Sequence, residues 1–215
     1  MKKITVPFLG EDCGLKAGDL VELSGKIYCG RDAVLPHVVA MAKEGTLGSC
    51  GVDLQGAVIF HTAVSCAGIA PTTTSKPEIQ GSMVPLSEKG VKFHMGKGLI
   101  SPETVEGLKR NHAYFLITPP VAALLTAQMG ECHAVIHPEF GMEAFYEITV
   151  KDFPAIVAAA DGETIFRSKG GIPDALFGTS DTRYRRSHCE GQLPLAGGSE
   201  GLLALRGGEG DASPG

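Results

Sequence analysis

Short apolar runs rich in β-branched and aromatic residues alternate along the chain with longer stretches whose apolar positions recur at helical spacing. Each short run predicts a strand, because a strand buries alternate or consecutive apolar side chains over about four to eight residues. Ser24-Gly25 is a turn signal between the first two runs, which are therefore expected to form two strands joined by a turn. The predicted strands cover residues 19–24, 26–29, 56–61, 91–95, 114–117, 133–136, 146–150 and 155–158.

Three stretches predict helices. The first runs from Asp32, a candidate N-cap, to about Glu44, with Pro36 in its first turn, where proline is tolerated. The second begins at Ser101, a capping residue that proline and acidic residues follow. The third lies near residues 121–129. Strands that alternate with helices after an antiparallel start predict an α/β layered domain with a mixed sheet.

The composition changes after Phe166. Glycine is concentrated in residues 167–215, and strongly periodic apolar segments are absent there. We therefore expect a folded domain at residues 1–166 and a Gly-rich, flexible C-terminal tail at residues 167–215. Arg183-Tyr-Arg-Arg186 is a basic patch within this tail, and a solvated charge run is its simplest interpretation.

The charge and the hydropathy of the chain narrow its partners. The net charge of −5 argues against nucleic acid, because phosphate binding requires a basic face. A small anion remains compatible, since a local cluster of cations overrides the global sign. No apolar run approaches the roughly 20 residues that span a bilayer, and the N-terminus lacks the apolar core of a signal peptide. We therefore expect no membrane association and a cytoplasmic location.

The cysteines and histidines suggest no metal site by their spacing. The six cysteines include no C-x-x-C pair, so free thiols are expected, although an iron–sulfur cluster needs only ligands that converge in space. The histidines match no zinc pattern and are expected in the core or on the surface. The residues considered for a metal are His61, His94, His133 and His137, with Cys66 and Cys132.

Candidate chemistry gathers in three short segments that combine cations or hydroxyls with small residues. These are Cys29-Gly-Arg-Asp-Ala33, Ala70-Pro-Thr-Thr-Thr-Ser-Lys76 and Gly96-Lys-Gly98. Arg31, Lys76 and Lys97 are candidates to hold a small dicarboxylate together, with the hydroxyls of Thr72 and Thr73 close by. A guanidinium binds a carboxylate through two parallel hydrogen bonds, and glycines allow a ligand to approach the backbone. On the residues alone, a surface ion pair, a self-satisfied turn and a solvated lysine stay open as alternatives.

The order of these segments resembles a known family. With the frame Gly18-Asp-Leu-Val-Glu-Leu-Ser-Gly-Lys-Ile-Tyr28 and the closing segment Asp152-Phe-Pro-Ala-Ile-Val157, they resemble the β subunit, or C-terminal domain, of the iron–sulfur hydro-lyases class I fumarase and L(+)-tartrate dehydratase. The resemblance covers residues 1–166 and implies a swivelling β/β/α domain. It also implies a hetero-oligomer in which a separate α subunit carries a 4Fe-4S cluster and this chain binds no metal.

The resemblance implies a reaction and residue roles. The reaction is reversible addition or removal of water on a small dicarboxylate, with fumarate/malate expected first and tartrate next. Thr72 falls on the position of the proton-abstracting base. Arg31, Lys76 and Lys97 fall on positions that bind substrate, and Thr73 is placed with them.

The chain also departs from the family pattern. Val34-Leu35 replace the Ala-His of the family motif, and His37 is a candidate substitute whose helical position turns it to another face. Lys76-Pro77 stand where an arginine is usual, and Pro119-Pro120 stand where paired glycines are common. These departures keep an alternative open, which is a catalytically altered paralogue that acts as a binding or interaction module.

Overall fold

The computed structural model describes residues 1–65 and 67–166, and these residues form a mixed α/β domain around an eight-stranded sheet. The predicted α/β fold with a mixed sheet is therefore confirmed. The strands of this sheet are β1 (Lys2–Val6), β2 (Leu20–Gly30), β3 (Val58–His61), β6 (Phe93–Gly96), β7 (Tyr114–Ile117), β8 (Met129–Ile136), β9 (Phe145–Ala160) and β10 (Glu163–Thr164). A separate small hairpin pairs β4 (Val64–Ser65) with β5 (Gly68–Ile69).

The sheet combines a parallel run with one long antiparallel strand. Neighbouring strands in the order β1-β2-β3-β6-β7 are parallel. Strand β9 is antiparallel to β7 and also to β2, so hydrogen bonds close the path β2-β3-β6-β7-β9 back onto β2. Because β2, β3, β6 and β7 are parallel neighbours, their carboxyl ends lie beside one another. We call this end of the sheet the edge.

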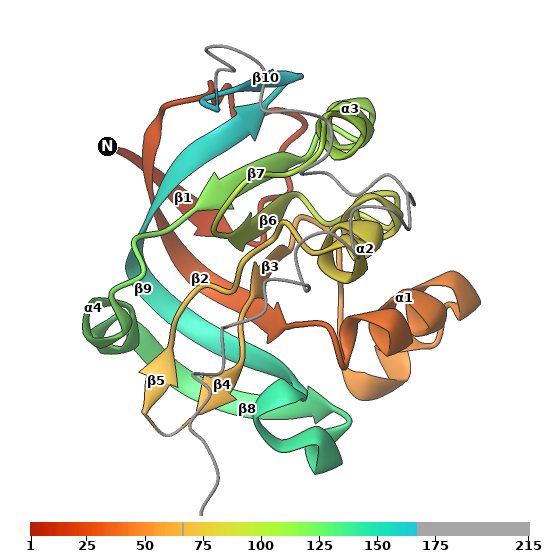
Figure 1. The fold of residues 1–215 in the computed structure, drawn as a ribbon. Coiled ribbons are helices and arrows are strands. Elements are labelled where there is room, and N and C mark those ends of the chain that lie inside the picture. The colour runs from red at the N-terminus through yellow and green to blue at the C-terminus, as the bar shows by residue number, and fades with distance from the viewer. Residues whose placement is uncertain (66, 167–215) are drawn as a thin grey trace, which may run out of the picture. The chain divides into compact units, whose positions relative to one another are not determined.

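Helices connect the parallel strands and cover one of their faces (Figure 1). The packing against α2 and α3 includes Met83 and Leu108 with Phe115 of β7, whereas the packing against α1 includes Val38 with Ile59 of β3. A third buried cluster fills the opposite face and reaches β9. The helical elements are α1 (Leu35–Glu44), η1 (Leu47–Cys50), α2 (Pro77–Ser87), α3 (Pro102–Arg110), α4 (Ala122–Ala127) and η2 (Pro138–Glu143), where η denotes a 3-10 helix.

Two expected strand breaks are absent, and the sequence-based prediction was wrong at both. Residues 20–30 form the single strand β2, and Gly25 with φ of +127° lies at a bulge in it. A Cβ atom at Gly25 would lie 2.0 Å from the carbonyl oxygen of Val6, so close approach of β1 requires glycine here. The runs 146–150 and 155–158 are likewise parts of β9, which continues through Asp152 at φ of +51°.

The helix starts differ in how well the sequence predicted them. Ser101 caps α3 by accepting a hydrogen bond from the amide of Thr104, as expected. The predicted cap of α1 was wrong, because that helix begins at Leu35 without a side-chain cap and the carboxylate of Asp32 instead binds two cations. Helix α2 was not predicted, since Pro85 lies inside it and proline disfavours a helix interior.

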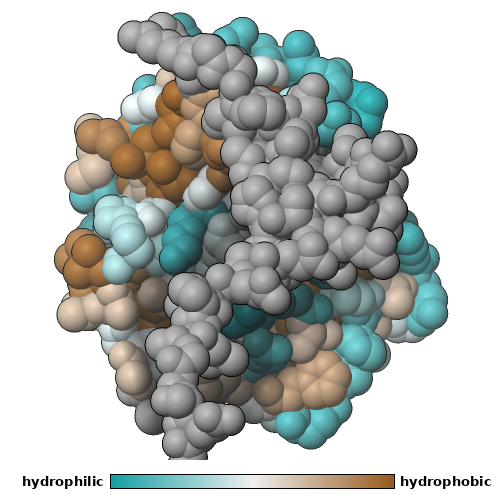
Figure 2. Space-filling model, in the orientation of Figure 1, coloured by the Kyte–Doolittle hydropathy of each residue, from teal (hydrophilic) through white to brown (hydrophobic). Residues whose placement is uncertain are grey.

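Exposed apolar side chains gather at α4. Val121 and Leu124 are 49% and 44% exposed there. Figure 2, in the orientation of Figure 1, shows apolar surface in brown at and near this helix. No helix in the part of the chain that the structure describes is long and apolar enough to cross a membrane. The predicted tail at residues 167–215, with its basic patch and Cys189, lies outside the described residues, as does Cys66. The division of the chain at residue 166 therefore stays a prediction.

Candidate functional site

The carboxyl ends of the parallel strands form one edge of the sheet. Gly30 of β2 pairs with His61 of β3, and Gly96 of β6 pairs with Ile117 of β7, so these strands end beside one another. Arg31 follows the first of them directly. In α/β proteins the crevice outside the carboxyl ends of parallel strands is a common place for ligands. The candidate segments therefore lie where the topology favours binding.

A loop of three threonines crosses this edge and is hydrogen-bonded to two strand ends. The amide of Thr72 donates to the carbonyl of His61 at 2.9 Å, and the amide of Lys97 donates to the carbonyl of Thr72 at 3.2 Å. Thr73 and Lys97 form an isolated parallel bridge, and the amide of Thr74 donates to the carbonyl of Lys97 at 2.8 Å. The fold thus brings together Thr72, Thr73 and Lys97, which the sequence places in separate segments.

The glycines beside Lys97 have a packing role. A Cβ atom at Gly96 would lie 2.4 Å from the Cγ2 atom of Thr74, and Gly98 has a φ of +91°. Glycine at both positions therefore lets the threonine loop lie against the end of β6 and lets the chain turn away after Lys97. Close approach to the loop explains these glycines before any ligand is considered.

The three threonine hydroxyls have different partners. Thr74 is buried and donates to the carbonyl of Lys97 at 2.6 Å, which makes it a structural group. Thr73 shares a hydrogen bond with the hydroxyl of Ser75 at 3.0 Å. Thr72 is only half-buried and donates its hydroxyl hydrogen to the carbonyl of His61. The lone pairs of the Thr72 oxygen are then available to accept hydrogen bonds.

Asp32 connects two of the candidate cations. Its Oδ1 accepts from the Nε of Arg31 at 2.7 Å, and its Oδ2 accepts from the Nζ of Lys76 at 3.0 Å. The hydrogen bond from Arg31, together with that from Lys76, holds the pKa of the Asp32 carboxyl well below its usual range. A second carboxylate lies close by, because the Oε1 of Glu143 is 3.1 Å from the same Nε of Arg31. Asp32, which the sequence analysis treated only as a candidate helix cap, therefore holds Arg31 and Lys76 near each other.

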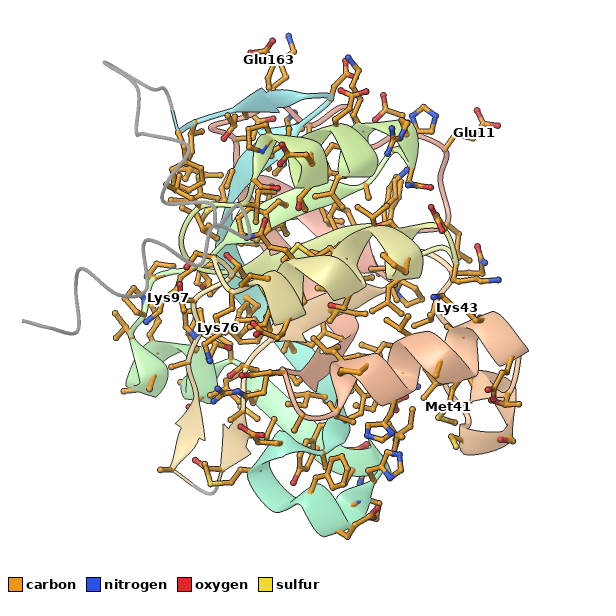
Figure 3. The ribbon with its side chains drawn as sticks, turned by 45° about the vertical axis from the view of Figure 1, so that its right-hand side comes forward. Glu11, Met41, Lys43, Lys76, Lys97 and Glu163 are labelled. Atoms are coloured by element: carbon orange, nitrogen blue, oxygen red, sulfur yellow. The ribbon has the colours of Figure 1, made fainter. Side chains whose placement is uncertain are left out.

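Lys97 differs from these two cations. It is exposed, and among the described residues no carboxylate lies within 4.0 Å of its ammonium group. Figure 3 shows Lys76 and Lys97 at the same side of the domain, away from Glu11 and Lys43. Lys97 therefore lies at the same edge as the threonine loop. Its ammonium group can bind an anionic ligand without first breaking an ion pair with a described carboxylate.

A buried histidine pair lies beneath this edge. The Nε2 of His61 is 3.4 Å from the Nδ1 of His94, whose Nε2 is 2.9 Å from the hydroxyl of Ser87. Burial lowers the pKa of His61 to about 3 and also lowers the pKa of His94, so both rings are neutral near pH 7. The Nδ1 of His61 has no hydrogen-bond partner among the described residues. These two are core histidines, whereas His133 is exposed on the surface.

His37 packs on the 3-10 helix that carries Glu143. Its ring centroid lies 4.7 Å from that of His137 and 5.5 Å from that of Phe140. His37 therefore contacts η2, and the distances place it in a surface aromatic cluster. Within residues 1–65 and 67–166, no three His, Cys, Asp or Glu side chains are arranged to hold a metal ion.

Two hollows of about 890 and 680 Å³ lie away from the candidate edge, the first lined by Tyr114 and Glu163 and the second by Phe8 and Lys92. Neither is lined by any of the predicted site residues. The candidate cations and hydroxyls gather instead at the ends of β2, β3 and β6.

Comparison with known proteins identifies a family for this chain. A family model described as fumarase C-terminus matches residues 11–169. A putative fumarate hydratase class I of Geobacillus stearothermophilus is 34% identical over 158 residues, which are 66% of this chain and 29% of that protein. The L(+)-tartrate dehydratase subunit beta of Escherichia coli strain K12 is 29% identical over 174 residues, which are 75% of this chain and 84% of that protein.

A further relative extends this comparison. The putative L(+)-tartrate dehydratase subunit beta of Methanocaldococcus jannaschii is 28% identical over 167 residues, which are 71% of this chain and 84% of that protein. The chain therefore spans only 29% of the length of the class I relative but 84% of each of these beta subunits. The matched region contains every predicted site residue, and the resemblance inferred from the sequence is confirmed. This chain belongs to the fumarase C-terminus family.

Proposed function

We propose that this chain is the β-type half of an iron–sulfur-dependent hydro-lyase that reversibly adds water to, or removes it from, a small dicarboxylate. The observation that carries the proposal is the gathering of Arg31, Lys76, Lys97 and Thr72 at one edge of the sheet, in a chain of this family. Fumarate/malate is the first candidate substrate and tartrate the second. The swivelling β/β/α arrangement belongs to the same proposal, and α1, α2 and α3 on one face of the sheet support it.

The cations act as the clamp for the substrate carboxylates. Arg31 keeps Nη hydrogens beyond those that contact Asp32, so it can still bind a carboxylate. Lys97 supplies a charge that no described carboxylate neutralises. Lys76 adds charge from the N-cap position of α2 but lacks a planar fork, so its contribution to orienting the ligand is smaller. Thr73 contributes a hydroxyl beside Lys97.

Thr72 is the proposed base. Dehydration of malate removes a proton from the carbon next to a carboxylate, and a threonine oxygen accepts such a proton only as its alkoxide. The cations at this edge favour that anion electrostatically, and the Thr72 backbone is fixed by hydrogen bonds to the ends of β3 and β6. Because the backbone is already fixed, the Thr72 oxygen is in place before the proton transfer. No conformational entropy then has to be lost during that step.

The remaining part of the site belongs to a partner in this proposal. An α subunit would carry the 4Fe-4S cluster, whose chemistry when bound is to accept the substrate hydroxyl as a Lewis acid. Among the described residues, the cysteines are not grouped as ligands for a cluster. The exposed apolar residues Val121 and Leu124 at α4, the helix that follows β7, support a surface that a second chain covers.

A binding or interaction module is the second candidate. The observation that favours it is that Arg31 and Lys76 are both already paired with Asp32, which reduces the positive charge offered to a ligand. In that case the chain would bind a carboxylate or a partner without catalysis.

Reconstitution separates the two candidates. The chain would be combined anaerobically with a cluster-bearing α subunit, and fumarate hydration and L-tartrate dehydration would be measured. Activity that requires both chains supports the hydro-lyase. An inactive pair with a fully loaded cluster, together with retained malate binding by the full chain, would instead establish the module.

A further inference from the structure

Glu143 is held beside Arg31 by charge rather than by a hydrogen bond. The Nε of Arg31 carries one hydrogen, and Arg31 donates it to Asp32 at 2.7 Å. The Oε1 of Glu143 lies 3.1 Å from that same nitrogen, yet it receives no hydrogen from it. Glu143 is thus the more weakly held of the two carboxylates, and its side chain is 38% exposed, compared with 29% for Asp32.

The charges around Arg31 balance before any ligand arrives. Arg31 and Lys76 contribute two positive charges, and Asp32 and Glu143 contribute two negative charges. An incoming carboxylate therefore meets a neutral cluster at Arg31, whereas Lys97 still offers one positive charge. Loss of Glu143 from Arg31 would restore a net positive charge where the ligand must bind.

The backbone holds Glu143 in this place. It ends η2, whose Phe140 packs against the rings of His37 and His137 at 5.5 and 4.8 Å. The hydroxyl of Tyr146 donates to the carbonyl of Gly141 at 2.8 Å and fixes the following turn. The proximity of Glu143 to Arg31 therefore follows from an anchored segment, while its side chain stays partly exposed to solvent.

We propose that Glu143 is an internal carboxylate that competes with the substrate for Arg31 and so determines the affinity of this half-site for dicarboxylates. The inference rests on the proposed function, because it takes Arg31 as the residue that binds a substrate carboxylate. The two possible roles of Glu143 predict opposite effects on the affinity for a dicarboxylate. Removal of a residue that only orients Arg31 would lower this affinity, whereas removal of a competitor would raise it.

Arginine modification measures this directly on the full chain. Phenylglyoxal reacts with guanidinium groups, and mass spectrometry of the digested chain reports the extent of reaction at Arg31. L-malate is added at increasing concentration, and the concentration that halves the rate at Arg31 is compared between variants. We expect Glu143→Gln to lower this concentration about twofold to fivefold, which is the size of the effect of one partly exposed ion pair.

Matched variants make the result specific. Glu139→Gln removes a charge from the same 3-10 helix, where Glu139 pairs with His137 at 2.8 Å, and should leave the malate concentration unchanged. Glu143→Asp keeps the charge but withdraws it by one methylene and should give an intermediate value, which also serves if Glu143→Gln folds poorly. In one outcome malate protects Arg31 in the wild type, while the malate concentration that halves the modification rate is unchanged or higher in the Glu143 variants. That result overturns the proposed competition but leaves the Arg31 clamp in place. Absence of protection in every variant overturns the Arg31 clamp and the competition with it.

Discussion

Replacement of Asp32 by asparagine tests whether one carboxylate holds the two candidate cations together. Asp32 accepts hydrogen bonds from Arg31 at the end of β2 and from Lys76 at the start of α2. Asp32→Asn keeps the shape and removes the charge, which leaves two cations near each other with only Glu143 to offset them. We therefore expect both a less stable domain and a less ordered clamp.

The size of the stability change follows from burial and geometry. Hydrogen bonds to charged groups contribute about 1.5–3 kcal/mol when they are well shielded, and exposed ion pairs contribute about 0.2–1 kcal/mol. The side chains of Arg31, Asp32 and Lys76 are 23%, 29% and 44% exposed, so solvent screens both pairs substantially. We expect Asp32→Asn to lower the free energy of unfolding by about 1–2 kcal/mol near pH 7.

The dependence on pH has a definite sign. Folding lowers the pKa of Asp32 below 3.8, its value in the unfolded chain, so the ionised carboxylate stabilises the fold fully above that pH. This contribution is lost as the pH falls from about 4 towards the folded pKa. The difference between wild type and Asp32→Asn should therefore be constant above about pH 5 and should shrink below pH 4.

Urea unfolding followed by circular dichroism from pH 7 to pH 3 measures this difference. Asp161→Asn is the matched control, because Asp161 is exposed and has no ion pair among the described residues, and it should change the free energy of unfolding little at any pH. The reasoning is refuted if Asp32→Asn is as stable as the wild type at pH 7, or if its deficit stays the same at pH 3.

Further predictions concern the reconstituted enzyme and acid stability. Arg31→Ala should lower kcat/KM on the order of 10²-fold, whereas the exposed Arg110→Ala should have little effect in the same assay. Thr72→Val should lower kcat strongly with little change in KM, while Thr73→Val should be much milder; comparable rates for Thr72→Val and wild type would remove its role as base. Because the pKa of buried His61 is lowered to about 3, the unfolded chain binds more protons below pH 6.5. Thermal melts should therefore show stability falling from about pH 6.5 towards pH 3, and replacement of the buried histidine pair by leucines should flatten that decline.

Local signals in the sequence were sufficient for much of the fold. The cap at Ser101 and the apolar runs at β3, β6 and β7 depend on neighbouring residues only, and these predictions were confirmed. Gly25 misled the prediction because glycine also serves where two backbones approach closely, and the approach of β1 is a tertiary feature. Helix α2 was missed because its buried face includes serines and its interior a proline, which weaken the helical pattern.

Some residues of the candidate site had a local signal in the sequence, and others did not. The segments that carry Arg31, Thr72 and Lys97 were found from their residue types and order, and the fold brings Thr73 beside Lys97 through a bridge between distant segments. Glu143 had no local signal, because it meets Arg31 only through the pairing of the start of β9 with the end of β2. Residues whose role depends on a contact between distant segments are found from the structure and not from the pattern.

Lys76 stands where an arginine is usual in the family, and its contact with Asp32 bears on this difference. Lys76 makes one contact, to the oxygen of Asp32 that faces it, and a single ammonium suffices for such a contact. An arginine at this position would add a second planar fork for a ligand carboxylate, which a lysine does not supply. The change therefore preserves the connection between β2 and α2. In the proposed half-site, carboxylate recognition is then expected to rely mainly on Arg31 and Lys97, and a carboxylate that binds Arg31 has to compete there with Glu143.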